Sequence, residues 1–144
     1  MTLFIDADGC PVVRLAAEMA AGRKIPCHIL CDTAHSFSIP GVQVTVCDKG
    51  ADSVDFALVR LLSAGDVVVT QDYGLAAMCL AKQAIPIHQD GLIYTEENID
   101  ALLLARHTAA KVRRSGGRLK GPTKRTGKQD AAFVNALTRL LDRK

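Results

Sequence analysis

Short apolar segments alternate with segments of helical periodicity along this 144-residue chain, and this alternation restricts the fold more than any other feature. The apolar, β-branched segments predict strands over residues 2–6, 25–31, 42–47, 66–70 and 85–88. The other segments predict helices over 11–21, 51–64, 75–82, 95–114 and 129–142. The expected apolar face of the first helix includes Leu15 and Met19, and Thr95 is the expected N-cap of the fourth. Strands that alternate with helices pair in parallel, so we expect an α/β fold with helices on both faces of a mainly parallel sheet of about five strands.

The length is typical of one domain with a sizeable core, and we expect a single domain over residues 1–144. The first residues contain no basic segment followed by a long apolar run. No stretch approaches the roughly 18 apolar residues that a membrane helix needs. These features predict a cytoplasmic protein without a membrane segment.

Carboxylates follow the predicted strands at the points where the strands end. Asp6 and Asp8 come with the end of the first strand, and Asp72 follows the fourth strand, two residues after Thr70. The carboxyl ends of parallel strands meet at one edge of a sheet, which is where ligands bind in open α/β sheets. We therefore expect these side chains to share one site.

Two further carboxylates, Asp52 and Asp55, stand at the start of the helix predicted after the third strand. They are three residues apart, so they share one helix face that begins at the same edge of the sheet. A helix start misplaced by one residue rotates each side chain by about 100°. The sequence therefore leaves open which of the two faces the site.

Several carboxylates at one place repel each other unless cations compensate their charge. Mg²⁺ and Mn²⁺ prefer oxygen ligands, and phosphodiester hydrolysis is the simplest chemistry that such a site supports. A second interpretation stays open, in which Asp8 caps the following helix and Asp6 is a solvated turn residue.

Charge is distributed unevenly along the chain. Residues 1–100 contain 6 Lys and Arg against 13 Asp and Glu, whereas residues 101–144 contain 12 against 2. The basic residues are concentrated in a Gly-rich loop at about 111–128, which predicts a surface for nucleic acid. The predicted contacts are Lys49, Arg113, Arg114, Arg118, Lys120, Lys124 and Arg125.

The five cysteines are odd in number and lie mostly in apolar segments, so we expect buried, reduced thiols. Cys10 stands near a predicted helix start, where the pKa of a thiol can fall. Asp6 and Asp8 oppose that shift, and we interpret Cys10 as a packing or capping residue.

Four segments together resemble the YaiI/YqxD family of bacterial proteins, a branch of the PIN-like nuclease fold. They are Asp6–Pro11 (DADGCP), Lys49–Asp55 (KGADSVD), Gly65–Ala76 (GDVVVTQDYGLA) and the later pairs Arg106–His107, Gly116–Arg118 and Gly121–Pro122. The resemblance implies a three-layer PIN-like domain with an acidic pocket, and a nuclease that favours RNA over DNA. It implies that the catalytic residues are Asp6, Asp8, Asp52, Asp55, Asp72 and Thr70, and that Mg²⁺ or Mn²⁺ is held by Asp6, Asp8, Asp52 and Asp72.

Two other functions remain open from the sequence. The acidic site could bind metal without turnover while the basic loop binds RNA. Alternatively, a strand ending in Asp6 and Asp8 and another ending in Thr70 match two motifs of haloacid-dehalogenase-like phosphatases. Asp6 would then be the nucleophile and Asp8 the general acid.

Overall fold

Five parallel strands form the sheet at the centre of the protein. The computed structural model describes residues 1–32, 38–47, 53–116 and 124–143. The strands are β1 (Leu3–Asp6), β2 (Cys27–Asp32), β3 (Gln43–Cys47), β4 (Val67–Val69) and β5 (Ile85–Ile87). Their order in the sheet is β3-β2-β1-β4-β5, and each neighbouring pair is parallel. The predicted parallel sheet is confirmed.

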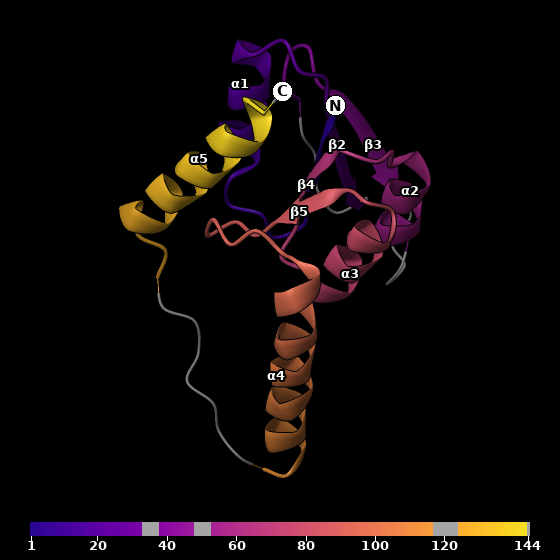
Figure 1. Ribbon diagram of the computed structural model, residues 1–144, viewed down its shortest axis with the longest axis vertical. Coiled ribbons are helices and arrows are strands. Elements are labelled where there is room, and N and C mark those ends of the chain that lie inside the picture. The colour runs from indigo at the N-terminus through magenta and orange to yellow at the C-terminus, as the bar shows by residue number, and fades with distance from the viewer. Residues whose placement is uncertain (33–37, 48–52, 117–123, 144) are drawn as a thin grey trace.

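Helices cover both faces of this sheet (Figure 1). On one face, α1 (Val13–Gly22) and α5 (Gly127–Leu141) pack against alternate strand residues such as Leu3 and Ile5. On the other face, α2 (Ser53–Leu61) and α3 (Tyr73–Ala81) pack against Phe4. Strands that are buried on both faces need apolar residues at successive positions, which is why β4 consists of three buried valines. The architecture is the three-layer α/β domain that the PIN-like resemblance implied.

The remaining helix, α4 (Glu96–Arg114), extends away from the three layers (Figure 1). Its predicted N-cap, Thr95, is confirmed: the Thr95 hydroxyl accepts a hydrogen bond from Asn98 N, and the Asn98 side chain accepts one from Thr95 N. Within the helix, Ile99 alone is buried. No helix in the described part of the chain has the length and hydrophobicity needed to cross a membrane.

The structure corrects the predicted start of α1. Pro11 lies in a turn, and the helix begins at Val13 with Val12 as N-cap. The turn exists because Gly9 adopts a φ of +70° and Cys10 N donates to Ala7 O at 3.1 Å. The buried helix face therefore consists of Val13, Ala16, Ala17 and Ala20, and the expected core residues Leu15 and Met19 are only partly buried.

Smaller differences concern the ends of three helices. α3 spans Tyr73–Ala81, against a prediction of 75–82. α2 ends at Leu61, three residues before the predicted end, and residues 48–52 lie outside the described ranges. α5 begins at Gly127 and ends at Leu141, against a prediction of 129–142. Its early start follows from the side chain of Gln129, which accepts a hydrogen bond from Thr126 N as part of a capping box.

Candidate active site at the carboxyl edge of the sheet

Asp6 and Asp72 come from neighbouring strand ends and are linked through Thr70. The Thr70 hydroxyl donates to Asp6 Oδ2 at 2.8 Å and accepts a hydrogen bond from Asp72 N at 3.0 Å. Thr70 itself is 1% exposed, and its carbonyl oxygen accepts a hydrogen bond from the Tyr94 hydroxyl at 3.1 Å. The hydroxyl therefore fixes the orientation of the Asp6 carboxylate, and the predicted proximity of these three residues is confirmed.

Asp6 lies at the end of β1, and the interpretation of it as a solvated turn residue is wrong. Burial raises its pKa from an ordinary 3.8 to about 6. The hydrogen bond from Thr70 opposes this rise, while the charges of Asp55, Asp8 and Asp72 add to it. A carboxyl group whose pKa is near neutrality, among other carboxylates, is typical of functional sites.

Asp8 lies in the turn that connects β1 to α1. Its Oδ1 accepts a hydrogen bond from Asp32 N at 3.3 Å, and Gln71 Nε2 donates to its backbone carbonyl at 3.3 Å. The alternative interpretation of Asp8 as the cap of α1 is wrong, because Val12 occupies that position and no side chain caps the helix. The φ of +70° favours glycine at position 9, and an added Cβ atom would also lie 2.8 Å from Gln71 Nε2, so the flexible Gln71 side chain would have to move.

Asp55 lies in the first turn of α2. Its charge adds to the rise in the pKa of Asp6, more than the charges of Asp8 and Asp72 do, so the Asp55 carboxylate lies in the neighbourhood of Asp6. The predicted residues Asp52 and Lys49 lie outside the described ranges. The structure therefore brings together Asp6, Asp8, Asp55, Asp72 and Thr70.

Asp72 is also the N-cap of α3, and its Oδ1 accepts hydrogen bonds from Gly74 N at 2.8 Å and Leu75 N at 3.2 Å. The same oxygen lies 3.7 Å from Arg106 Nη1 of α4. The Arg106 side chain is 62% exposed, so its guanidinium stands over the edge of the site and remains accessible from solvent.

Three residues beyond the predicted set belong to this region. Arg106 and Tyr94 reach it through tertiary packing; Arg106 belongs to one of the segments that carry the family resemblance, whereas no local sequence signal marks Tyr94 as a site residue. Asp32 was predicted to lie in a loop but is the last residue of β2. The rule that an acid at a strand end lies at this edge would have identified Asp32.

The donor set suits a hard cation, because it consists of carboxylate and hydroxyl oxygens without thiols or imidazoles. Among residues 1–32, 38–47, 53–116 and 124–143, however, no three His, Cys, Asp or Glu side chains are close enough to hold a metal ion together. The described residues thus provide a group of carboxylates near one another, and not an assembled metal centre.

The predicted nucleic-acid contacts separate into exposed and internally paired side chains. Arg113 and Arg114 are exposed at the far end of α4, and Lys124 is exposed before α5, whereas Arg118 and Lys120 lie outside the described ranges. The guanidinium of Arg125 contacts Asp90 Oδ1 at 2.6 Å, Asp130 Oδ1 at 2.7 Å and Gln89 O at 2.7 Å. These contacts give Arg125 a structural role, and a contact with nucleic acid stays a prediction.

All five cysteines are free and four of them are buried, in agreement with the expectation of reduced thiols. Burial raises the pKa of Cys10 to about 11, and the charge of Asp6 adds to this shift. The thiol is therefore protonated at neutral pH, as expected for a packing residue.

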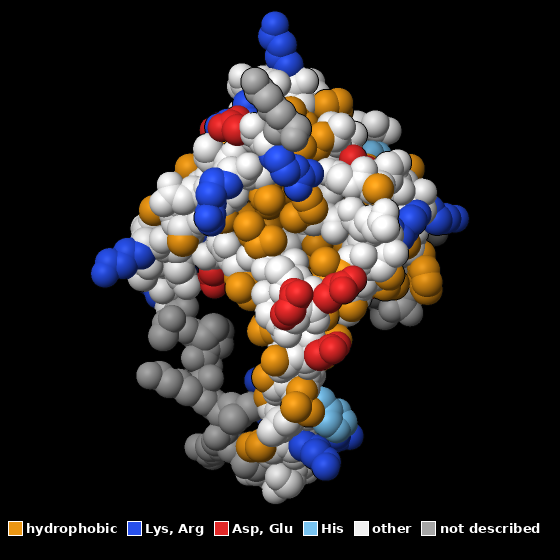
Figure 2. Space-filling view, in the orientation of Figure 1, with side chains coloured by type: hydrophobic (Ala, Val, Ile, Leu, Met, Phe, Trp, Pro, Cys, Tyr) orange, Lys and Arg blue, Asp and Glu red, His pale blue; other side chains and the backbone are white. Residues whose placement is uncertain are grey.

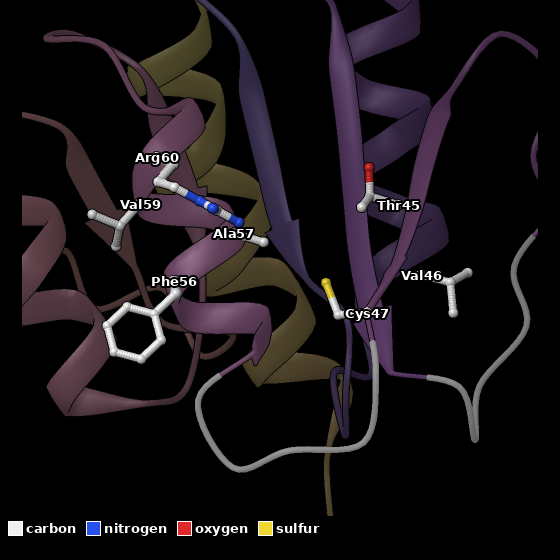
Figure 3. Close-up of a pocket in the computed structure, with 7 residues that line it drawn as sticks. All are labelled: Thr45, Val46, Cys47, Phe56, Ala57, Val59 and Arg60. Atoms are coloured by element: carbon white, nitrogen blue, oxygen red, sulfur yellow. The ribbon is translucent and has the colours of Figure 1, made fainter.

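A separate pocket of about 620 Å³ lies between α2 and β3 (Figure 3). Its lining includes Cys47 on β3 and Phe56, Ala57 and Arg60 on α2. None of the carboxylates described above lines it. This pocket is therefore distinct from the group of carboxylates at the strand ends.

Comparisons with known proteins cover nearly the whole chain. The family model described as "Uncharacterized BCR, YaiI/YqxD family" matches residues 4–143. A UPF0178 protein of Exiguobacterium sibiricum is 49% identical over 144 residues, covering 100% of this chain and 99% of that protein. A UPF0178 protein of Clostridium acetobutylicum is 48% identical over 145 residues, covering 99% of this chain and 98% of that protein. No solved structure matches the chain.

Proposed function

This chain belongs to the YaiI/YqxD family, and we propose that it is a nuclease that hydrolyses phosphodiester bonds with the help of Mg²⁺ or Mn²⁺. The observation that carries this proposal is the gathering of Asp8, Asp55 and Asp72 near Asp6 at the carboxyl edge of a parallel sheet, where Thr70 links Asp6 with Asp72. These side chains come from three different parts of the chain, and their charges raise the pKa of Asp6. Repulsion between neighbouring carboxylates lowers the stability of the folded protein. Such destabilising groups of charges are typical of functional sites.

The cation would be held by carboxylates of this edge. Asp6, Asp8 and Asp72 are the proposed ligands within the described ranges, and Asp52 is the proposed ligand beyond them. Asp55 lies in the neighbourhood of Asp6 and belongs to the same acidic set. A bound Mg²⁺ or Mn²⁺ would lower the pKa of a water molecule and stabilise negative charge on the phosphate.

Other residues of the protein hold the carboxylates in place and supply positive charge for binding phosphate. Thr70 holds Asp6 in one orientation, and the hydrogen bonds from Gly74 N and Leu75 N hold Asp72. The exposed guanidinium of Arg106 is well placed to bind a phosphate group beside Asp72. Further along the chain, Arg113, Arg114 and Lys124 offer backbone contacts to a longer nucleic acid.

RNA is the proposed substrate in preference to DNA because the acidic motifs resemble those of PIN-like endoribonucleases. The whole chain contains 4% aromatic residues and no Trp, so platforms for stacking bases are scarce. Contacts to the phosphate backbone therefore supply most of the proposed affinity, and binding should weaken steeply with salt.

One observation favours a second function. Arg113, Arg114 and Lys124 are exposed, which suits a protein that binds nucleic acid through these residues while its acidic site binds metal without turnover. Both functions predict salt-dependent binding, so only turnover separates them.

The test is cleavage of labelled single-stranded and double-stranded RNA and DNA in Mg²⁺, Mn²⁺ or EDTA. The wild type should cleave RNA with metal and not in EDTA. Asp8→Asn and Asp72→Asn should each lower the rate by about 100-fold or more, because a neutral amide is a much weaker ligand than a carboxylate. Asn caps helices as well as Asp, so Asp72→Asn should preserve α3.

Asp100→Asn is the matched control, because it makes the same chemical change on the exposed surface of α4. It should leave cleavage within about twofold of the wild type. Equal cleavage by Asp8→Asn, Asp72→Asn and wild type would identify a contaminant and refute the proposal. Salt-dependent binding of RNA without any cleavage would support the second function instead.

A further inference from the structure

An apolar stripe runs along the part of α4 that leaves the body of the protein. Its residues recur at helical spacing and line an open hollow of about 480 Å³, and they are Ala101, Leu104, Ala105, Thr108, Ala109 and Val112. Leu104 is 66% exposed, more than any other large exposed hydrophobic residue in the described ranges. A stripe of this length on a protruding helix is typical of an interaction surface.

Packing within the described ranges leaves much of this stripe open, since Ala101, Leu104 and Ala105 are exposed. α4 is attached to the body through a different set of side chains, in which Ile99, Leu102 and Leu103 pack near Ala76 and Tyr94. The stripe lies on another side of the same helix and continues for several turns beyond Ile99. Within the described ranges, the side chains of the stripe therefore bury little apolar surface when the monomer folds.

The two ends of α4 carry opposite charges. Glu96, Glu97 and Asp100 stand at the end attached to the body, and Lys111, Arg113 and Arg114 stand at the far end. Figure 2 shows the acidic side chains near the body and basic side chains toward the tip of the helix. A helix with this pattern complements a second copy of itself that runs in the opposite direction.

We propose that two copies of this protein pair through α4, with the two helices antiparallel about a two-fold axis. Ala101 and Val112 are eleven residues apart, which is about three helical turns, so they lie on the same side of the helix. The two-fold axis passes between them and places Ala101 of each copy opposite Val112 of the other. This proposal is independent of the nuclease proposal.

The same symmetry pairs the flanking charges. Asp100 and Lys111 are also eleven residues apart and both are exposed, so they lie along one edge of the stripe. In an antiparallel pair, residues on one edge face the same edge of the partner helix. Asp100 of each copy therefore comes within reach of the long Lys111 side chain of the other copy, at two equivalent positions.

The size of the surface sets the expected strength of pairing. A helix of 19 residues is about 28 Å long, and its stripe consists mostly of small side chains. Two such helices bury less area than the roughly 1,200–2,000 Å² of a standard interface. We therefore expect dimers that dissociate at micromolar concentrations.

Sedimentation velocity of the full chain between about 1 and 100 μM tests the proposal, with dimers expected to increase across this range. Leu104→Glu should abolish the dimer, because it places two carboxylates in the apolar contact. Leu61→Glu is the matched control, since Leu61 is a 47% exposed leucine on α2, and it should leave the dimer intact. A wild type that is monomeric at 100 μM, or a Leu104→Glu variant that still dimerises, would overturn the proposal.

Charge exchange tests the antiparallel arrangement itself. Asp100→Lys and Lys111→Asp should each weaken dimerisation by about tenfold or more, because each creates like-charge pairs at two positions. The double variant should restore the affinity to within about threefold of the wild type. Circular dichroism should show that each variant keeps its helix content. Failure of the double variant to recover, with that content unchanged, would refute this orientation.

Discussion

The last two helices of the chain, α4 and α5, are both amphipathic but differ in how much of their apolar face is buried. α5 buries Phe133, Ala136, Leu137, Leu140 and Leu141 against α1 and the sheet. α4 is longer and also amphipathic, yet only Ile99 is buried. The comparison teaches that the packed body and the α4 arm must respond differently to the same substitution, because burial, and not helix formation, carries most of the stabilising free energy.

The largest contrast is expected for core side chains. Phe133 is 0% exposed, and Phe133→Ala should lower the free energy of unfolding by about 3–5 kcal/mol because it leaves a cavity between α5 and the sheet. Leu104→Ala on α4 should change it by less than about 0.5 kcal/mol. Urea denaturation of both variants at a concentration where the protein is monomeric measures the difference. Equal effects would contradict the comparison.

Carboxylates in the body and on the arm should differ in their pH dependence. The pKa of Asp6 is about 6 in the folded protein against 3.8 ordinarily, so the folded state binds this proton more tightly than the unfolded state does. The contribution of Asp6 therefore makes the protein less stable as pH rises from about 4 to about 6, by up to about 3 kcal/mol, and is constant above that range.

Asp6→Asn removes this contribution, so its stability relative to the wild type should rise between pH 4 and pH 6. Asp100→Asn makes the same chemical change on the exposed surface of α4 and is the matched control. Denaturation curves in EDTA, collected at several pH values, test this expectation. A stability difference between Asp6→Asn and wild type that does not vary with pH would show that Asp6 ionises normally.

Two glycines with positive φ provide a smaller contrast. A Cβ at Gly91, whose φ is +94°, would lie 2.6 Å from Ala132 O, so Gly91→Ala should force α5 to shift and cost about 2 kcal/mol or more. Gly116 follows α4 with a φ of +85°, and no described atom lies within 4 Å of its added Cβ. Gly116→Ala should cost about 1 kcal/mol from backbone strain alone. Thermal unfolding of the two variants should rank them in this order.

The smallest contrast concerns two arginines. Arg125 is 22% exposed and connects Asp90 with Asp130, so Arg125→Met should lower stability by about 1–2 kcal/mol and loosen the attachment of α5. Arg106 is 62% exposed and lies 3.7 Å from Asp72, so Arg106→Met should change stability by less than about 0.5 kcal/mol. Hydrogen exchange of α5 amides distinguishes the two variants. Unchanged exchange in Arg125→Met would show that the apolar contacts alone hold α5.

The sequence predicted the sheet, its strands and the cap of α4 because these depend on local patterns. Apolar runs such as the valines of β4 and the Thr95 and Asn98 pair can be read without knowledge of distant residues. The carboxylates at the strand ends were predicted in the same way, since parallel topology brings Asp6, Asp8 and Asp72 to one edge. Asp66 precedes β4 and so lies at the other edge of the sheet, where it accepts hydrogen bonds from Thr2 N and Ser63 N.

Tertiary structure decided what depends on residues far apart in the chain. Because of the turn at Gly9, α1 begins later in the chain than predicted and buries a different face. The Gln71 side chain donates a hydrogen bond to the Gly9 carbonyl in this turn. The pairing of Arg106 with Asp72, the contacts of Arg125 and the effect of Asp55 on the pKa of Asp6 likewise required the packed structure. The sequence predicts the apolar face of α4, but it does not predict that this face is exposed. Periodicity shows that a helix has an apolar face, whereas only the positions of all other elements decide whether anything covers it.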